Sequence, residues 1–202
     1  MPLTRRLLLA TTTATLAALR GAYAQANDPR MAERGIGNPD AKVTVAEYFS
    51  LTCTHCAAFQ RETFPQVKQQ LIDTGRIRYV WRDYPLDQLA LTAAMVARAL
   101  PPERYEPFIT ALLSTQDRWA FARNINPTEE LAKMAALAGM SRATFDATVR
   151  DNELKQAILA EQAEGEKKFA VNSTPSFIIN GKVTAGAVPY DTFLKAVDTA
   201  AP

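Results

Sequence analysis

The sequence contains few of the residues that bind metal ions, with two cysteines and one histidine among 202 residues. A closed zinc site needs four ligands, most often cysteine and histidine side chains, and this chain does not supply them. It also has no cluster of lysine and arginine with interleaved aromatic residues, which is the pattern expected of a nucleic-acid surface. We therefore expect no metal, no cofactor and no nucleic-acid partner.

Long apolar runs are also absent. The most apolar stretch, Leu7–Leu19, is about a dozen residues long, whereas a membrane-spanning helix needs roughly 20. Hydrophobic residues make up 48% of the chain and charged residues 22%, which is ordinary for a soluble globular protein. We expect a soluble mature protein with one domain, or with a small domain that carries a large insertion.

Residues 1–24 have the pattern of an export signal. Arg5 and Arg6 precede the apolar run, and Ala22-Tyr23-Ala24 follows it as a small-x-small cleavage site. The paired arginines resemble a twin-arginine signal, but an ordinary Sec signal also carries such pairs, so both routes stay open. An uncleaved N-terminal anchor is the alternative interpretation of this segment.

The next residues predict a leader followed by the first strand of the fold. Residues 25–41 are rich in Asn, Pro, Gly and charge without apolar periodicity, so we expect a leader without regular structure and a fold that starts near Lys42. Val43–Phe49 is β-rich and mostly apolar on both faces, which is typical of a central strand buried between two layers.

A helix and a second strand follow the first strand. The spacing from Cys53 to Leu71 is helical, and we expect Pro65 to kink this helix and Gly75 to stop it. Residues 76–81 mostly alternate between polar and apolar side chains, as a strand does.

The rest of the chain predicts a helical insertion and a closing unit. Five helical segments are expected, at 86–100, 103–116, 129–138, 142–151 and 153–169. Asn180-Gly181 between two short apolar runs predicts a hairpin, and an amphipathic helix follows Pro189. The order of elements is strand, helix, strand, helical insertion, hairpin and helix, which indicates an α/β fold.

Cys53 and Cys56 form a Cys-x-x-Cys pair that follows a buried strand and opens a helix. The first cysteine lies over unpaired backbone N–H groups and the positive helix end, and both stabilise a thiolate. We expect Cys53 to have a depressed pKa and to remain exposed, and Cys56 to be more buried and to act as the resolving thiol. Such a pair closes a disulfide or exchanges it through a mixed disulfide.

The redox interpretation has alternatives. The pair could be half of a zinc site, which the ligand count disfavours, or a structural disulfide, which gains little stability from so short a loop. His55, the single histidine, lies between the cysteines, where a partly cationic imidazole would add to thiolate stabilisation. It could also be a solvated bystander.

The segment Glu47–Cys56, the later Ser173–Phe177 and the helical block between them resemble DsbA-type thiol-disulfide oxidoreductases of the thioredoxin superfamily. The resemblance covers roughly residues 42–200. It implies a thioredoxin-like fold, a central β-sheet with flanking helices formed by residues 42–85 and 170–202, with an all-helical insertion at 86–169. It also implies that Pro175 is a cis proline facing the redox pair, and that Thr174-Pro175 presents backbone groups to a substrate peptide.

The same resemblance suggests a role for Glu47 as a buried proton shuttle for Cys56; the alternative is an exposed carboxylate at the end of a strand. Two residues depart from the pattern of strong oxidases. Thr54 replaces a proline common between the cysteines, and Thr174 is shared with isomerases and reductases of the superfamily. These departures leave the direction of catalysis open.

The resemblance implies a periplasmic enzyme that introduces disulfides into exported proteins. Its substrates would be unfolded or partly folded exported proteins, and a membrane partner of the DsbB kind would reoxidise it. A disulfide reductase or isomerase kept reduced by a membrane partner is one alternative, and a non-catalytic chaperone-like binding module is another. The leader carries no heptads, so we expect a monomer rather than the dimer typical of isomerases.

Overall fold

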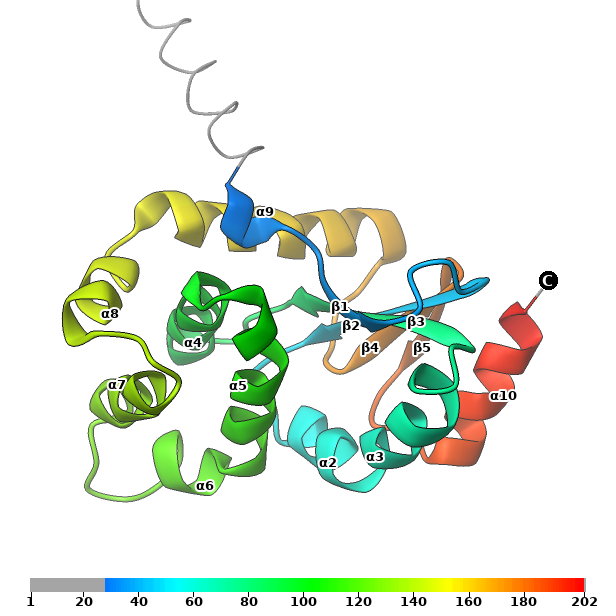
Figure 1. The fold of residues 1–202 in the computed structure, drawn as a ribbon, viewed down its shortest axis with the longest axis horizontal. Coiled ribbons are helices and arrows are strands. Elements are labelled where there is room, and N and C mark those ends of the chain that lie inside the picture. Colours follow the sequence, from blue (N-terminus) through cyan, green and yellow to red (C-terminus); the bar gives the residue numbers. More distant parts are fainter. Residues whose placement is uncertain (1–27, 202) are drawn as a thin grey trace, which may run out of the picture.

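The computed structural model describes residues 28–201, and the expected export signal lies outside them. A five-stranded mixed sheet forms the centre of the molecule, in the order β1-β3-β2-β4-β5. Helices cover both of its faces, and a group of helices extends from one end (Figure 1). Within the described residues, no helix is both long enough and apolar enough to cross a membrane.

The strands have the bounds β1 Arg34–Gly37, β2 Val43–Phe49, β3 Ile77–Asp83, β4 Ser176–Ile179 and β5 Lys182–Ala185. The central strand β2 pairs in parallel with β3 and antiparallel with β4. Its predicted burial is confirmed, because only Thr44 is exposed along it. The Asn180-Gly181 hairpin between β4 and β5 is also confirmed, and both turn residues have positive φ.

The expectation that the fold starts near Lys42 is wrong. Residues Pro29–Met31 form the short helix η1, and β1 adds an antiparallel edge strand to β3. The strand was missed because it reads Arg-Gly-Ile-Gly, and glycine weakens a strand signal. Glycine is needed there because a Cβ atom at Gly35 would lie 2.7 Å from the carbonyl oxygen of Tyr79.

One face of the sheet carries α2 Thr54–Glu62, α3 Phe64–Val67, η2 Lys68–Ile72 and α10 Tyr190–Ala200. The helix α9 Asn152–Phe169 covers the opposite face (Figure 1). The single helix expected from Cys53 to Leu71 is divided at Thr63, and Pro65 is the second residue of α3. Gly75, at φ +74°, ends the segment as predicted.

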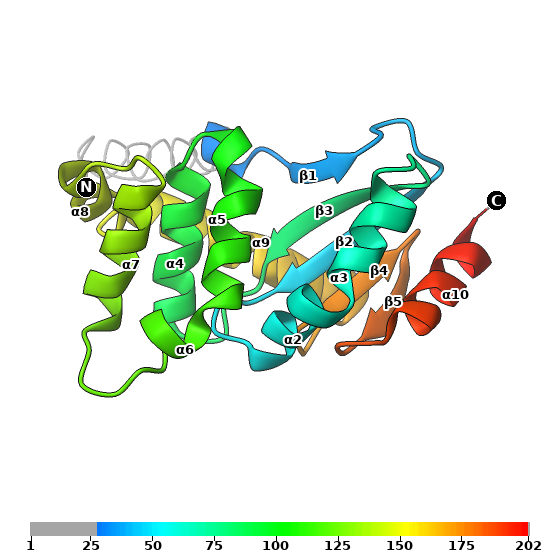
Figure 2. The same ribbon diagram turned by 60° about the horizontal axis from the view of Figure 1, so that its bottom comes forward.

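The predicted helical insertion is present at one end of the sheet (Figure 2). Its elements before α9 are α4 Gln88–Ala99, α5 Pro102–Ser114, α6 Gln116–Trp119, α7 Pro127–Leu137 and α8 Arg142–Thr148. The core of the sheet continues into these helices, since one cluster of buried side chains includes Phe59 of α2, Leu112 of α5 and Phe145 of α8. The insertion and the sheet therefore fold around a shared core.

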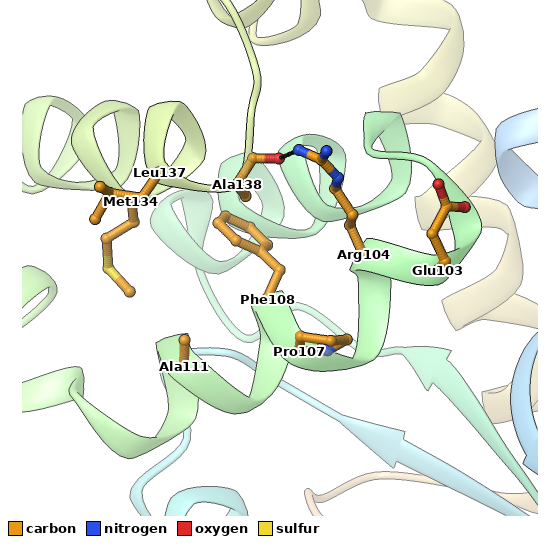
Figure 3. Close-up of a pocket in the computed structure, with 8 residues that line it drawn as sticks. All are labelled: Glu103, Arg104, Pro107, Phe108, Ala111, Met134, Leu137 and Ala138. Carbon is orange, nitrogen blue, oxygen red and sulfur yellow. Dashed lines mark hydrogen bonds between the residues drawn. The ribbon is translucent and has the colours of Figure 1, made fainter.

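A pocket of about 460 Å³ opens between α5 and α7 (Figure 3). Phe108 and Met134 lie on opposite sides of it, and Arg104 closes one end by donating a hydrogen bond to the carbonyl oxygen of Ala138. None of the site residues predicted from the sequence lines this pocket.

Candidate active site

Cys53 is the N-cap residue of α2, directly after the loop Ser50–Thr52 that ends β2. Its Sγ atom accepts a hydrogen bond from the backbone N–H of Cys56 at 3.4 Å. This N–H is one of the unpaired donors at the helix start, so the sulfur takes the place that a serine or aspartate oxygen occupies in other helices. The predicted position at a helix start is confirmed.

The two cysteines of this turn differ in acidity. The thiol of Cys56 lowers the pKa of Cys53 to about 5, and the backbone N–H groups of Cys56 and His55 add to this effect against the opposing effect of burial. Burial raises the pKa of Cys56 well above its ordinary value, and the thiol hydrogen bond to Cys53 adds to the increase. At neutral pH the reduced pair therefore holds one thiolate and one thiol.

The expectation that Cys53 remains exposed is wrong, because only 7% of the residue is accessible. The segment before β4 covers it: the Cys53 Sγ atom lies 3.3 Å from the carbonyl oxygen of Thr174, to which the protonated thiol donates. The Thr174-Pro175 peptide bond is cis, as the resemblance implied. Thr174 and Pro175 thus lie beside the redox pair despite their distance along the chain.

The helical insertion holds the loop that leads to Cys53. The side-chain amide of Gln116, in α6, donates to the carbonyl oxygens of Leu51 at 2.8 Å and Cys53 at 3.0 Å. The Thr52 hydroxyl donates to the Asp87 carboxylate at 2.7 Å. Gln116 is buried and gave no sequence signal, because a lone glutamine in a helical block is ordinary.

Glu47 lies within β2 and is 2% exposed, so the alternative of an exposed strand-end carboxylate is wrong. Burial raises its pKa to about 8, although a hydrogen bond from the Tyr79 hydroxyl at 2.8 Å acts in the opposite direction. A negative charge on Cys53 also raises the pKa of Glu47. The carboxyl group is therefore electrostatically coupled to the redox pair.

His55 is exposed at the first turn of α2. It contributes its backbone N–H to the lowered pKa of Cys53. Cys53, Cys56, Thr174 and Pro175 thus form one buried group. Glu47 lies in the layer beneath this group, and the imidazole of His55 lies in solvent.

Such an arrangement suits thiol-disulfide exchange. A thiolate at a helix start is a good nucleophile and a good leaving group, and a neighbouring thiol can displace whatever is bound to it. Leu86, which follows β3, is an exposed apolar side chain with 52% of its surface accessible. The Leu86 backbone N–H donates to the Ser50 hydroxyl at 3.3 Å, which places Leu86 beside the active-site loop.

Comparisons with known proteins agree with this chemistry. A family model described as Thioredoxin matches residues 30–199. A Rickettsia conorii protein with the provisional name protein-disulfide oxidoreductase is 32% identical over 166 residues, which are 82% of this chain and 59% of the relative. This chain spans 57–60% of the length of such Rickettsia proteins.

Solved structures of DsbA proteins are similar over most of their length. The alpha-DsbA1 protein of Wolbachia pipientis has a TM-score of 0.76 and 28% identity, over 87% of this chain and 94% of that one. Oxidised BdbD from Bacillus subtilis has a TM-score of 0.72 and 19% identity, over 83% of this chain and 92% of that one, which indicates a shared fold.

Proposed function

Because this chain belongs to the thioredoxin family and has DsbA proteins among its structural neighbours, we propose that it catalyses thiol-disulfide exchange through Cys53 and Cys56. The observation that carries the proposal is the placement of the two thiols in one helical turn, with Cys53 at the N-cap, where its Sγ accepts the Cys56 N–H at 3.4 Å, and Cys56 1% exposed. The pKa of Cys53 is lowered to about 5, and that of Cys56 is raised well above its ordinary value.

In the oxidising direction, a substrate thiolate attacks the Cys53 sulfur of the Cys53-Cys56 disulfide. Cys56 leaves as a thiolate and takes up a proton, and the substrate is joined to Cys53 in a mixed disulfide. A second substrate thiolate attacks the substrate sulfur of this mixed disulfide and releases the Cys53 thiolate. The substrate gains a disulfide, and the two electrons remain on the reduced cysteine pair.

The low pKa of Cys53 favours this direction. A stabilised thiolate lowers the free energy of the reduced protein, so the disulfide form becomes a stronger oxidant. We therefore propose an enzyme that introduces disulfides into unfolded or partly folded exported proteins. It acts in the periplasm as a monomer, and a membrane partner of the DsbB kind reoxidises it.

The other site residues have roles in this scheme. We assign Thr174 and Pro175 to binding an extended substrate segment beside Cys53, with exposed Leu86 contacting an apolar substrate side chain. Glu47 exchanges the proton of Cys56. His55, exposed in the first turn of α2, acts on Cys53 by charge when its imidazole is protonated.

Oxidation of a reduced, unfolded substrate protein in glutathione buffer tests the proposal. The mature protein should accelerate disulfide formation, and Cys53→Ser should abolish the acceleration, whereas Cys56→Ser should accumulate mixed disulfides with the substrate. Equilibration of the cysteine pair against glutathione gives its potential. A pair more reducing than glutathione would favour the reductase or isomerase alternative, and full activity of Cys53→Ser would favour the binding module.

A further inference from the structure

We infer that Tyr79 is a positioning residue of the redox site, whose hydroxyl holds one carboxyl oxygen of Glu47 and leaves the other to exchange a proton with Cys56. The inference rests on the proposed function and deepens it. The alternation of residues 76–81 indicates only a core position for Tyr79.

The first step is the geometry of the sheet. Glu47 of β2 lies opposite Trp81 of β3, and Val45 lies opposite Tyr79, so these four side chains project from the same face. Phe177 of β4 is the antiparallel partner of Glu47 and lies on this face too. Its ring packs 4.6 Å from Phe59 of α2, which identifies the face as the one that the redox helix covers.

The second step is the hydrogen bonding of the carboxyl group. Tyr79 Oη donates to Glu47 Oε2 at 2.8 Å, and both residues are fully enclosed, with 0% and 2% exposure. No other hydrogen bond to the Glu47 carboxyl group occurs within residues 28–201. One oxygen is therefore fixed, while the other has no protein partner that would compete for a proton.

The third step is the set of ionisable groups around Glu47. From β3 it faces Tyr79, and from the start of α2 it interacts with the charges of Cys53 and Cys56. The strand β4 supplies no ionisable side chain, and the other ionisable residues of α2, namely His55, Arg61 and Glu62, are exposed. The hydroxyl of Tyr79 stays protonated at neutral pH, because burial raises its pKa well above the ordinary value.

The proton balance follows from these contacts. When Cys56 attacks a mixed disulfide, its thiol proton passes to the Glu47 carboxylate and its sulfur bonds to Cys53 Sγ. The bond between Cys53 and the bound thiol breaks, and that thiol leaves as a thiolate with the electron pair. In the reverse reaction, protonated Glu47 returns the proton to Cys56 as it leaves. The Tyr79 hydroxyl stabilises the carboxylate in both directions.

Tyr79→Phe removes the hydroxyl and keeps the ring that packs 5.3 Å from Phe64 and 5.5 Å from Trp81. Reduced protein is mixed with oxidised glutathione, and the second release of glutathione reports the attack by Cys56. In the wild type this rate should rise with pH to a midpoint somewhat below 8, because the mixed disulfide removes the Cys53 charge that contributes to the Glu47 pKa of about 8. In Tyr79→Phe the midpoint should move up by about one unit and the rate at pH 7 should fall about tenfold, with the difference vanishing at high pH.

Tyr105→Phe is the matched control, because Tyr105 is equally buried, packs 6.1 Å from Trp81 and has a hydroxyl without a hydrogen-bond partner among the described residues. It should leave the profile unchanged. In a Glu47→Gln background, Tyr79→Phe should have no further effect on the rate. Glu47→Asp shortens the side chain and so separates the carboxylate from the Tyr79 hydroxyl, which stays in place. This variant should show the same loss of rate at pH 7, and it tests the contact even if Tyr79→Phe does not fold.

A pH-independent loss in Tyr79→Phe, or a loss that persists beside Glu47→Gln, would overturn the inference and leave Tyr79 a packing residue. So would wild-type behaviour of both Tyr79→Phe and Glu47→Asp. These outcomes differ from failure of the proposed function, in which the wild-type protein itself would not react with oxidised glutathione.

Discussion

Cys53 and Cys56 are separated by one turn of α2, yet their thiols have opposite tendencies to ionise. The Cys56 thiol and the backbone N–H groups at the open end of the helix lower the pKa of Cys53 to about 5. Cys56 is enclosed on the side that faces the sheet, and burial raises its pKa. The difference arises from position alone, because the two residues are chemically identical. A helix start therefore separates a nucleophile from a resolving thiol.

Glu47 and Cys53 make opposing contributions to the pH dependence of stability in the reduced protein. Glu47, with a pKa raised from 4.5 to about 8, stabilises the fold at low pH, and this contribution is lost as the pH rises towards 8. Cys53, with a pKa lowered from 9.0 to about 5, stabilises the fold at high pH, and this contribution is lost as the pH falls towards 5. Between these values the two effects largely cancel.

Glu47→Gln should unmask the contribution of Cys53. We expect the free energy of unfolding of the reduced variant to rise between pH 5 and pH 8 by up to about 1.4 kcal/mol per unit relative to the wild type, measured by urea unfolding at each pH. The double variant Glu47→Gln/Cys53→Ser should lose this slope. Equal slopes in the single variant and the wild type would contradict the assignment.

The sequence predicts the site residues that belong to a local motif and misses those brought in from elsewhere. Cys53, Cys56 and the Thr174-Pro175 segment were named because their spacing or their resemblance to a family marks them. The Tyr79 hydroxyl was missed because inward-facing aromatic residues in a strand usually serve only the core. The exposure of Cys53 was predicted wrongly because the carbonyl that covers it comes from Thr174, 121 residues away.

At the scale of elements, α6 fixes the loop before α2. The Gln116 amide supplies donors to two carbonyl oxygens, those of Leu51 and Cys53, in a place that water reaches poorly. This contact links the helical insertion to the backbone of the nucleophile itself. The insertion therefore contributes to the geometry of the redox turn.

Gln116→Met should destabilise the protein by about 1–3 kcal/mol, because it keeps the volume of the side chain but leaves the buried carbonyl oxygen of Leu51 without its donor, whereas that of Cys53 keeps the backbone N–H of Ala57. Gln88→Met, at an exposed position of α4, is the control and should change the free energy of unfolding by no more than about 0.5 kcal/mol. Chemical denaturation of the two variants tests the expectation. Equal stability would mean that the loop is held without Gln116.

The predictability of each element depends on how much of its pattern is local. The strand β2, the hairpin β4–β5 and the helix α10 were predicted because apolar spacing and turn residues define them. The strand β1 was missed because its pairing with β3 depends on a close backbone approach, which requires glycine rather than a β-forming side chain.

At the scale of the whole molecule, a buried ion cluster joins the sheet to α4 and α9, the first and last helices of the insertion. Arg98 of α4 is 0% exposed and pairs with Asp83 of β3 at 2.5 Å and with Glu161 of α9 at 3.0 Å. It also donates to the carbonyl oxygen of Ala32, before β1. The thioredoxin-like fold with its helical insertion is confirmed by the sheet order and by the similar DsbA structures.

Arg98→Met should lower the free energy of unfolding by about 3–5 kcal/mol, because Asp83 and Glu161 lose their shared cation inside the protein. Arg142→Met removes an exposed arginine that pairs with Glu129 and Asp146 in solvent, and should leave the free energy of unfolding close to that of the wild type. Thermal and urea unfolding of both variants give the comparison. Similar losses of stability in the two variants would show that the buried Arg98 ion pairs contribute no more than exposed ones.

The most direct test concerns the ionisation of the nucleophile. The rate at which iodoacetamide alkylates Cys53 in the reduced protein, measured across pH, follows the fraction of thiolate. We predict a midpoint at about 5, where the α2 start and the Cys56 thiol stabilise the anion. A midpoint near the ordinary value of 9.0 would contradict the account, because the two thiols would then be equivalent and the turn would have no preferred site of attack.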